Sequence, residues 1–265
     1  MNTTNLILII YHQILCFDKF KSVKSASGAM SFIFCDANSG SIVDIVENRR
    51  IHVLKAYFLQ YTKRARNSVK TIVIDMYQPY ITLIKEMFPK ADIIIDKFHL
   101  VQLFSRAFNK TRVKCMNQDN KNYTKLKNYW KLLLKERSKV DYTHFKYHRS
   151  FKRHMREIDI INYLLDSNPE LKASYELYHS VQYCIKNKQI NWLKRTLEEN
   201  QTSVSHYMKV AIKTTKKYMN YIENTLKYNY TNGILEGINN KIKVIKRIAF
   251  GFKCFYHFKN RILIN

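Results

Sequence analysis

The sequence is poor in cysteine motifs, glycine, proline and long apolar runs. Its 5 cysteines are far apart, their number is odd and no CxxC pair occurs, which argues against a disulfide framework or a zinc finger and for a reducing compartment. With 5 glycines and 3 prolines the chain has no low-complexity linker, and it shows no internal repeat. The apolar run near the start, LILII, is far shorter than the ~18 residues of a membrane span, and no signal-peptide features accompany it.

Acidic residues are also scarce, with 20 Asp and Glu against 46 Lys and Arg and a formal charge of +26. This excess predicts a polyanionic partner, with nucleic acid first and an anionic membrane surface second. The 19 tyrosines and 15 phenylalanines lie among the lysines, a pattern that suits phosphate neutralisation combined with base stacking. A general drift towards lysine in an AT-rich genome is the alternative explanation. Because 46% of the 265 residues are hydrophobic, we expect one large folded domain, or one domain with a large insertion.

Residues 69–99 predict a strand–helix–strand unit. Two short runs rich in Val and Ile end at Asp75 and Asp96, which is typical of buried strands, and the segment between them has apolar residues at helical spacing. A connection of this length favours parallel strands, whose carboxyl ends are where open α/β sheets bind ligands. Asp75 and Asp96 are therefore candidate site residues, although a strand-end aspartate also commonly caps a helix or lies in a solvated loop.

The preceding residues predict three more strands and a helix. ILCFDKF and MSFIFCD, within residues 14–36, alternate loosely, and SIVDIV follows a loop of hairpin composition at 36–40. Residues 51–66 place their apolar side chains on one face, which indicates an amphipathic helix. The predicted order is β-β-β-α-β-α-β.

Residues 97–228 contain no good strand signal and several helical ones. We therefore predict an all-helical insertion at 100–228 within a core formed by 14–99 and 229–265. Residues 1–13 are left as an unassigned leader.

The last informative stretch is Asn232–Arg261, a predicted helix and the residues that follow it. Glu236 is the only acid after Glu223, and it shares one helical face with three polar or basic residues at i+4, i+7 and i+11. Those residues are Asn240, Lys243 and Arg247. A lone carboxylate in a basic stretch is also explained as a salt-bridge partner.

Asp18 in the first strand, Asp75 at the end of the fourth and Glu236 on the late helix form a specific pattern. In a ribonuclease-H-like fold the first and fourth strands are neighbours at the centre of a mixed five-strand sheet, and a helix packs beside them. Three carboxylates placed there can bind two divalent cations about 3.5–4 Å apart, and magnesium prefers such oxygen ligands.

The chain resembles the DDE transposases of bacterial insertion sequences, in the group written ISL-three. The resemblance runs from about Ile14 to the C-terminus and is carried by four blocks in order: FDKFKSVK, TIVIDMYQPY, FPKADIIIDKFHLVQL with its basic NKTRVK tail, and NGILEGINNKIKVIKRIAFGF. It implies a catalytic domain that cuts and joins DNA strands at the ends of an insertion sequence and in target DNA, as a homo-oligomer assembled on DNA, in the nucleoid-associated cytoplasm and away from membranes.

The resemblance also implies the site residues. Asp18, Asp75 and Glu236 become the catalytic and metal-binding triad for Mg²⁺ or Mn²⁺, with two ions expected. Asp96 and His99 match an accessory D-x-x-H element that supports the site, and a packing role at a helix start is the alternative for His99. The residues expected to contact DNA are Asn240, Lys243, Lys246, Arg247 and Arg112.

Two departures from the family pattern stand out. Members usually carry an acid where Lys19 stands beside Asp18. Full-length members also have an N-terminal zinc-binding segment and a helix-turn-helix region, neither of which is found in this sequence. Three hypotheses follow: a transposase catalytic domain with intact metal chemistry, an inactive remnant that still binds DNA non-specifically, and, less favoured because of the long insertion, a ribonuclease-H-type nuclease.

Overall fold

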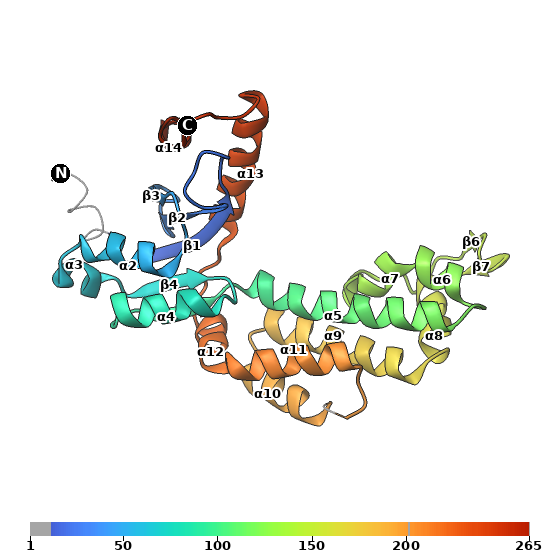
Figure 1. The fold of residues 1–265 in the computed structure, drawn as a ribbon. Helices are drawn as coiled ribbons and strands as arrows, with labels where there is room; N and C mark the ends of the chain where they lie inside the picture. The colour runs from blue at the N-terminus through green and yellow to red at the C-terminus, as the bar shows by residue number, and fades with distance from the viewer. Residues whose placement is uncertain (1–11, 201, 265) are drawn as a thin grey trace. The chain divides into compact units, whose positions relative to one another are not determined.

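The computed structural model describes residues 12–200 and 202–264, and the chain divides into two compact units (Figure 1). The first unit contains residues 12–99 and 220–264, and the second is Leu100–Met219. All but the last two residues of the predicted 1–13 leader lie outside the described residues.

A five-stranded sheet in the order β3-β2-β1-β4-β5 forms the centre of the first unit. The strands β1, β2 and β3 pair antiparallel, whereas β1–β4 and β4–β5 pair parallel. The predicted mixed five-strand sheet is confirmed, as is the placement of the first strand beside the fourth. The bounds are β1 Ile14–Lys21, β2 Met30–Asp36, β3 Ile42–Val46, β4 Thr71–Ile74 and β5 Asp92–Ile95.

Helices cover both faces of this sheet. On one face, α2 (Ile51–Leu59) and α4 (Gln78–Met87) pack over an aromatic cluster in which Phe17 stacks on Phe58 at a centroid distance of 5.7 Å. Burying each such ring contributes about 1.5–3 kcal/mol. On the other face, α13 (Gly233–Ile248) and α14 (Phe255–Ile264) bury their apolar residues against side chains such as Cys16. Because adjacent residues of a strand face opposite sides, Phe17 and Cys16 serve the two layers separately.

One predicted helix differs from the observed structure. The single helix expected at 51–66 is two, because α2 stops at Leu59 and α3 (Lys63–Ser68) starts after Thr62, whose hydroxyl accepts from Ala65 N at 3.2 Å. A threonine N-cap of this kind is a strong start signal that the apolar periodicity conceals.

The helix α12 (Met219–Lys227) lies mostly in the first unit, although the prediction assigned residues up to 228 to the insertion. Its Thr225 hydroxyl donates to Ile95 O at 2.6 Å and accepts from Ile95 N at 3.1 Å. The Thr225 side chain therefore pairs the backbone N–H and C=O of Ile95 at the free edge of β5. An unpaired edge of this kind could otherwise pair with another chain.

The second unit is mainly helical and begins within α5 (Lys97–Gln118). Its other helices are α6 Tyr123–Asn128, α7 Trp130–Leu134, α8 Glu157–Asp166, α9 Pro169–Lys186, α10 Ile190–Glu199 and α11 His206–Lys217, with a short 3-10 turn at Arg137–Lys139. None of the helices within residues 12–200 and 202–264 combines the length and apolar character needed to cross a bilayer.

The prediction that the insertion is all-helical is wrong at one place. An antiparallel hairpin of β6 (Lys146–His148) and β7 (Arg153–Met155) forms a separate two-stranded sheet. These strands are three residues long, mostly exposed and rich in basic residues, so they carry no apolar alternation that a sequence reading could detect.

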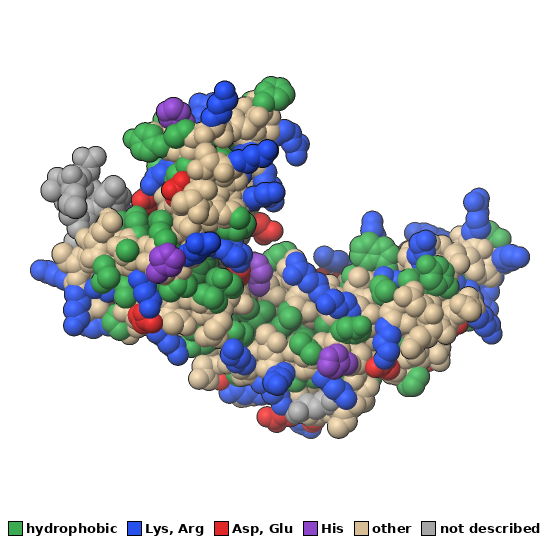
Figure 2. Space-filling model, in the orientation of Figure 1, with side chains coloured by type: hydrophobic (Ala, Val, Ile, Leu, Met, Phe, Trp, Pro, Cys, Tyr) green, Lys and Arg blue, Asp and Glu red, His purple; other side chains and the backbone are tan. Residues whose placement is uncertain are grey.

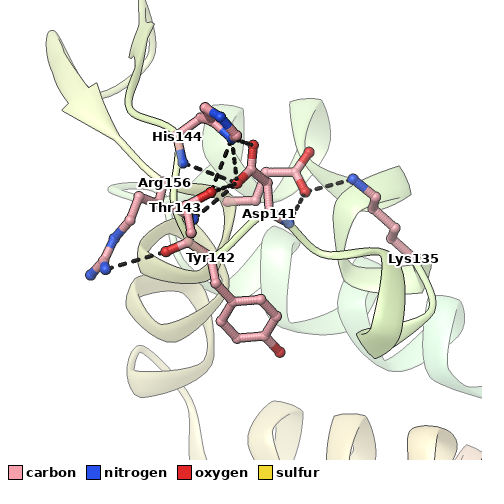
Figure 3. Close-up of polar contacts among 7 residues, drawn as sticks. Lys135, Asp141, Tyr142, Thr143, His144 and Arg156 are labelled. Atoms are coloured by element: carbon pink, nitrogen blue, oxygen red, sulfur yellow. Dashed lines mark hydrogen bonds and ion pairs between the residues drawn. The ribbon is translucent and has the colours of Figure 1, made fainter.

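The turn that leads into this hairpin is held by carboxylates (Figure 3). Asp141 accepts from the backbone N–H groups of His144 at 3.0 Å and Thr143 at 2.9 Å, and these hydrogen bonds hold the pKa of Asp141 below its usual range. Glu157 accepts from Asp141 N at 2.8 Å and from the Lys135 ammonium at 2.6 Å, which ties the turn to α7 and α8. The hairpin thus starts from a defined point of the second unit.

Candidate active site

Three aspartates lie on the same face of the sheet. Cys16 is in register with Val73 on the parallel neighbour, so Asp18 and Asp75 each follow two residues later, on the same side of their strands. Val73 is in register with Ile94 on β5, so Asp96 also follows two residues later. This face is the one covered by α13, because Cys16, Val73 and Ile94 belong to its apolar layer. The strand register therefore places the three aspartates on one face of the sheet of the first unit.

Asp75 is 8% exposed and has only one of its two oxygens paired among the described residues. Its Oδ2 is in an ion pair with the Lys19 ammonium, whereas its Oδ1 is buried without a hydrogen-bond partner. Leaving a buried carboxylate oxygen unsatisfied is costly, and a bound ion or water is one explanation of such an atom. Lys19 reaches this position from the residue next to Asp18.

Asp18 has its own set of partners. Its Oδ1 accepts from Lys19 N at 2.8 Å and its Oδ2 from the Asn239 amide at 2.8 Å. Burial raises the pKa of Asp18, and the negative charge of Asp75 adds to the rise, although the hydrogen bond from Lys19 N acts in the opposite direction. A second positive charge near the two carboxylates would relieve this repulsion.

Asp96 and His99 lie at the start of α5, beside the two carboxylates. Asp96 is 3% exposed, and its Oδ2 lies 3.4 Å from Nδ1 of His99. This contact raises the pKa of His99 against the opposing effect of burial, and the charges of Asp75 and Asp18 raise it further. The sequence pair D-x-x-H is thus placed at the edge of the cluster.

Glu236 is not gathered with the aspartates. It is exposed near the start of α13, and within residues 12–200 and 202–264 no three His, Cys, Asp or Glu side chains are arranged to hold a metal ion. Asn239, one turn later, is the residue of α13 that contacts Asp18, and Asn232 donates to Phe17 O at 3.2 Å. Glu236 therefore lies between two residues that face β1.

The sequence reading missed Asn239. The sequence pattern indicated Asn240 instead. Asn240 is exposed, and its Oδ1 accepts from the Lys243 ammonium at 3.0 Å. The signal that could have identified Asn239 is its spacing of seven residues, two helical turns, from Asn232.

The basic residues predicted to contact DNA divide into two groups. Lys243 and Arg247 are exposed on α13. Lys246 is half-buried, its ammonium donates to Ser22 O at 3.0 Å, and burial lowers its pKa. Arg112 is 7% exposed, and its guanidinium donates to Leu126 O at 2.7 Å. The positions of Lys246 and Arg112 are at odds with the prediction, because the charged group of each holds a backbone carbonyl and the Arg112 side chain is buried.

Comparisons with known proteins place the chain in a family. It is 25% identical over 229 residues to the transposase for insertion sequence element IS1001 of Bordetella parapertussis, a match that covers 83% of this chain and 53% of that protein. It is 37% identical over 111 residues to a Lactococcus lactis subsp. lactis protein named ATP-dependent protease, covering 42% of this chain and 36% of that protein.

The chain thus spans about half the length of the first relative and about a third of the second. No solved structure matches it. The family model of the ISL3 DDE transposases, described as a transposase, matches residues 15–262, nearly the whole chain. The chain therefore belongs to the ISL3 family of DDE transposases.

Proposed function

We propose that this chain is the catalytic part of a transposase that cleaves DNA at insertion-sequence ends and joins it to target DNA. The observation that carries the proposal is the position of Asp18 and Asp75, side by side on neighbouring parallel strands, with one buried oxygen of Asp75 unpaired. The order of the five strands and the helix beside β1 support a ribonuclease-H-like core. The net charge of +26 supports DNA as the partner, and a homo-oligomer on that DNA is part of the proposal.

The donor set fits a divalent cation. Asp18 and Asp75 offer the oxygen ligands that Mg²⁺ and Mn²⁺ prefer, and the unpaired Oδ1 of Asp75 is an available lone-pair site. Glu236 would complete the set by turning toward β1 from its place one turn before Asn239. When bound, two such ions would activate an attacking water or 3′-hydroxyl and stabilise the leaving oxygen.

The chain's own residues have separate tasks in this proposal. Asn239 holds the Asp18 carboxylate by its amide, which fixes the orientation of one proposed ligand. Asp96 lies against His99 and orients the imidazole beside the cluster. The exposed Lys243 and Arg247 bind phosphates of the DNA strand.

A second candidate function is an inactive remnant that binds DNA without cutting it. The ion pair of Lys19 with Asp75 favours it, because an ammonium occupies one oxygen of a proposed metal ligand. The exposed position of Glu236 favours it as well.

Thermal unfolding with and without metal separates the two candidates. A cation that binds only the folded chain stabilises it by about 2.7 kcal/mol at a hundredfold excess over Kd, and so raises its melting temperature. We expect Mg²⁺ or Mn²⁺ to raise the melting temperature of the parent chain, and Asp75→Asn to abolish that shift along with strand transfer from pre-cut element ends. Asp166→Asn, an exposed acid of the second unit, is the matched control and should keep both.

Two results would decide against the proposal. Equal metal-induced shifts in the parent and in Asp75→Asn would show that the cation is held elsewhere. A parent chain that binds DNA but gains no stability from either metal would establish the remnant.

A further inference from the structure

A second feature of the first unit is a cavity of about 410 Å³ outside the carboxylate cluster. It lies between the residues that precede β2, the loop from β3 to α2, and the segment that leads into α4. Arg49, Arg50 and His52 line it together with the ring of Tyr77. No carboxylate belongs to its lining, so the cavity is cationic.

The two arginines are available to a ligand. Within the described part of the chain, neither Arg49 nor Arg50 forms an ion pair with an acid. Arg49 is half-buried and Arg50 is exposed. The adjoining start of α2 has no acid in its first turn and no side-chain cap, so its backbone N–H groups add to the positive potential. An anion with several acceptor oxygens would satisfy these groups together.

The wall of the cavity is fixed by Asn48. This side chain is 6% exposed, its Oδ1 accepts from Arg50 N at 3.0 Å and its Nδ2 donates to Ser27 O at 3.3 Å. Gly28 packs so closely that a Cβ there would lie 2.7 Å from Cγ of Asn48. Because a larger residue would displace Asn48, the shape of the cavity depends on this glycine.

Tyr77 connects the cavity to the carboxylates. Its backbone N–H donates to Asp75 O at 2.8 Å. Its ring centroid lies 5.1 Å from the Lys19 ammonium, which pairs with Asp75, and 5.1 Å from the guanidinium carbon of Arg49, which lines the cavity. One aromatic ring therefore separates the proposed metal ligands from a cationic pocket.

We propose that this pocket binds a backbone phosphate of the DNA strand that enters the active site, with Arg49 and Arg50 as its ligands. Arginine presents a planar set of donors that matches phosphate oxygens. The phosphate would anchor the strand on one side of Tyr77 while a neighbouring phosphodiester lies at the aspartates on the other. This inference rests on the proposed function, since it takes a DNA strand as the substrate.

The test measures binding of a short fluorescent single-stranded oligonucleotide by anisotropy, without metal and with EDTA present. Arg49→Ala/Arg50→Ala should weaken binding by about tenfold or more, because two charged hydrogen-bond donors are lost. The matched control is Lys63→Ala/Arg64→Ala on α3, which removes the same charge from exposed positions outside the pocket and should change affinity by less than about twofold.

A second arm replaces single phosphates of the oligonucleotide with neutral methylphosphonates. At one position, the neutral substitution should weaken binding to the parent severalfold and should not weaken binding to Arg50→Ala any further. Arg50→Ala changes an exposed side chain and so is expected to fold. Inorganic phosphate and a nucleoside triphosphate are tested as competitors and should displace the oligonucleotide only at far higher concentrations.

Equal losses in the two double variants, or no methylphosphonate position that depends on Arg50, would overturn the inference. Displacement by free phosphate or the triphosphate at concentrations matching the oligonucleotide would overturn it too, in favour of a small-anion site. Because binding is measured without metal, failure of the cleavage chemistry leaves this result intact. Unchanged binding together with normal strand transfer in the Arg49/Arg50 variant would reject the pocket and leave the proposed function standing.

Discussion

Lys19 is the residue that most alters the charge of the candidate site. It follows Asp18 in β1, yet its ammonium pairs with Asp75 on the next strand, and the same ammonium lies over the ring of Tyr77. In the proposed metal site, this fixed positive charge would compete with the cation. Without metal, Lys19 also neutralises the buried carboxylate of Asp75. Lys19 should therefore stabilise the metal-free fold and weaken the affinity for metal.

We predict that Lys19→Met binds Mn²⁺ about tenfold more tightly than the parent chain. Removing a unit charge about 4 Å from a ligand is worth about 1 kcal/mol in water and more inside a protein, and 1.4 kcal/mol is a factor of ten. Without metal the variant should melt at a lower temperature, because Asp75 loses its partner. Melting temperature followed through a Mn²⁺ titration measures both effects.

Lys19→Arg keeps the positive charge and serves as the control, with affinity close to that of the parent. Weaker or unchanged Mn²⁺ binding by Lys19→Met would argue that Asp75 is not a metal ligand.

His179, in the second unit, provides a second prediction at the residue scale. It is 4% exposed on α9, its Nε2 donates to Leu133 O at 3.1 Å, and burial lowers its pKa to about 4. An unfolded chain has a histidine pKa of about 6.5. Between these values the unfolded state binds more protons, so stability is full above pH ~6.5 and falls as the pH drops toward 4.

The expected loss is up to about 3 kcal/mol, at about 1.4 kcal/mol per unit of pKa difference. Urea unfolding at pH 7 and pH 4.5 measures it, with His179→Gln as the comparison because its amide donates without titrating. The parent should lose clearly more stability than this variant over the interval. Equal losses would mean that His179 titrates as in the unfolded chain.

The helix α13 has an apolar face and a basic face. Leu235 and Ile242 are buried against the sheet, whereas Lys243 and Arg247 point to solvent. Lys246, which the sequence grouped with the exposed residues, instead holds the connection between β1 and β2 through Ser22 O. The basic face is therefore narrower than the sequence pattern suggests.

We predict that Lys243→Ala/Arg247→Ala weakens binding to duplex DNA of any sequence. If both residues neutralise phosphates, the slope of log affinity against log salt should become shallower by about 1.8, at about 0.9 per phosphate. Lys213→Ala/Lys216→Ala on α11 removes the same charge from exposed positions of the second unit and is the control. A slope that changes no more than in this control would assign DNA binding to another surface.

Elements also show where periodicity fails as a guide. The break between α2 and α3 depends on the hydroxyl of Thr62, and the hairpin β6–β7 on the carboxylates of Asp141 and Glu157 that hold its entry. In both places a few polar contacts override the apolar pattern, so a reading based on that pattern overlooks them.

At the scale of the whole molecule, one unit is formed from two distant parts of the chain. Residues 12–99 supply the sheet and its aspartates, and residues 220–264 return after the second unit to supply α12, α13 and α14. Two hydrogen bonds hold the returning segment against the sheet. Thr225 donates to Ile95 O of β5, and Asn232 donates to Phe17 O of β1. Asn239 is brought to Asp18 in this way, although 220 residues lie between them in the sequence.

Basic side chains are distributed over much of the visible surface (Figure 2). The charge of +26 therefore predicts general attraction to DNA without identifying where the strand lies. Only particular arrangements distinguish a site from this background, such as Arg49 beside Tyr77 at the cationic cavity.

The sequence by itself determined the five strands, their order along the chain, the placement of the first strand beside the fourth and the family. These follow from local apolar runs, from the rule that parallel strands need a crossover, and from residue blocks that remain recognisable. The tertiary structure alone decided the partners of those residues: Lys19 on Asp75, Asn239 on Asp18, and backbone carbonyls for Lys246 and Arg112. The physical reason is that a side chain's partner depends on which segments pack together and how deeply, and neither quantity is encoded in the spacing of residues along one segment.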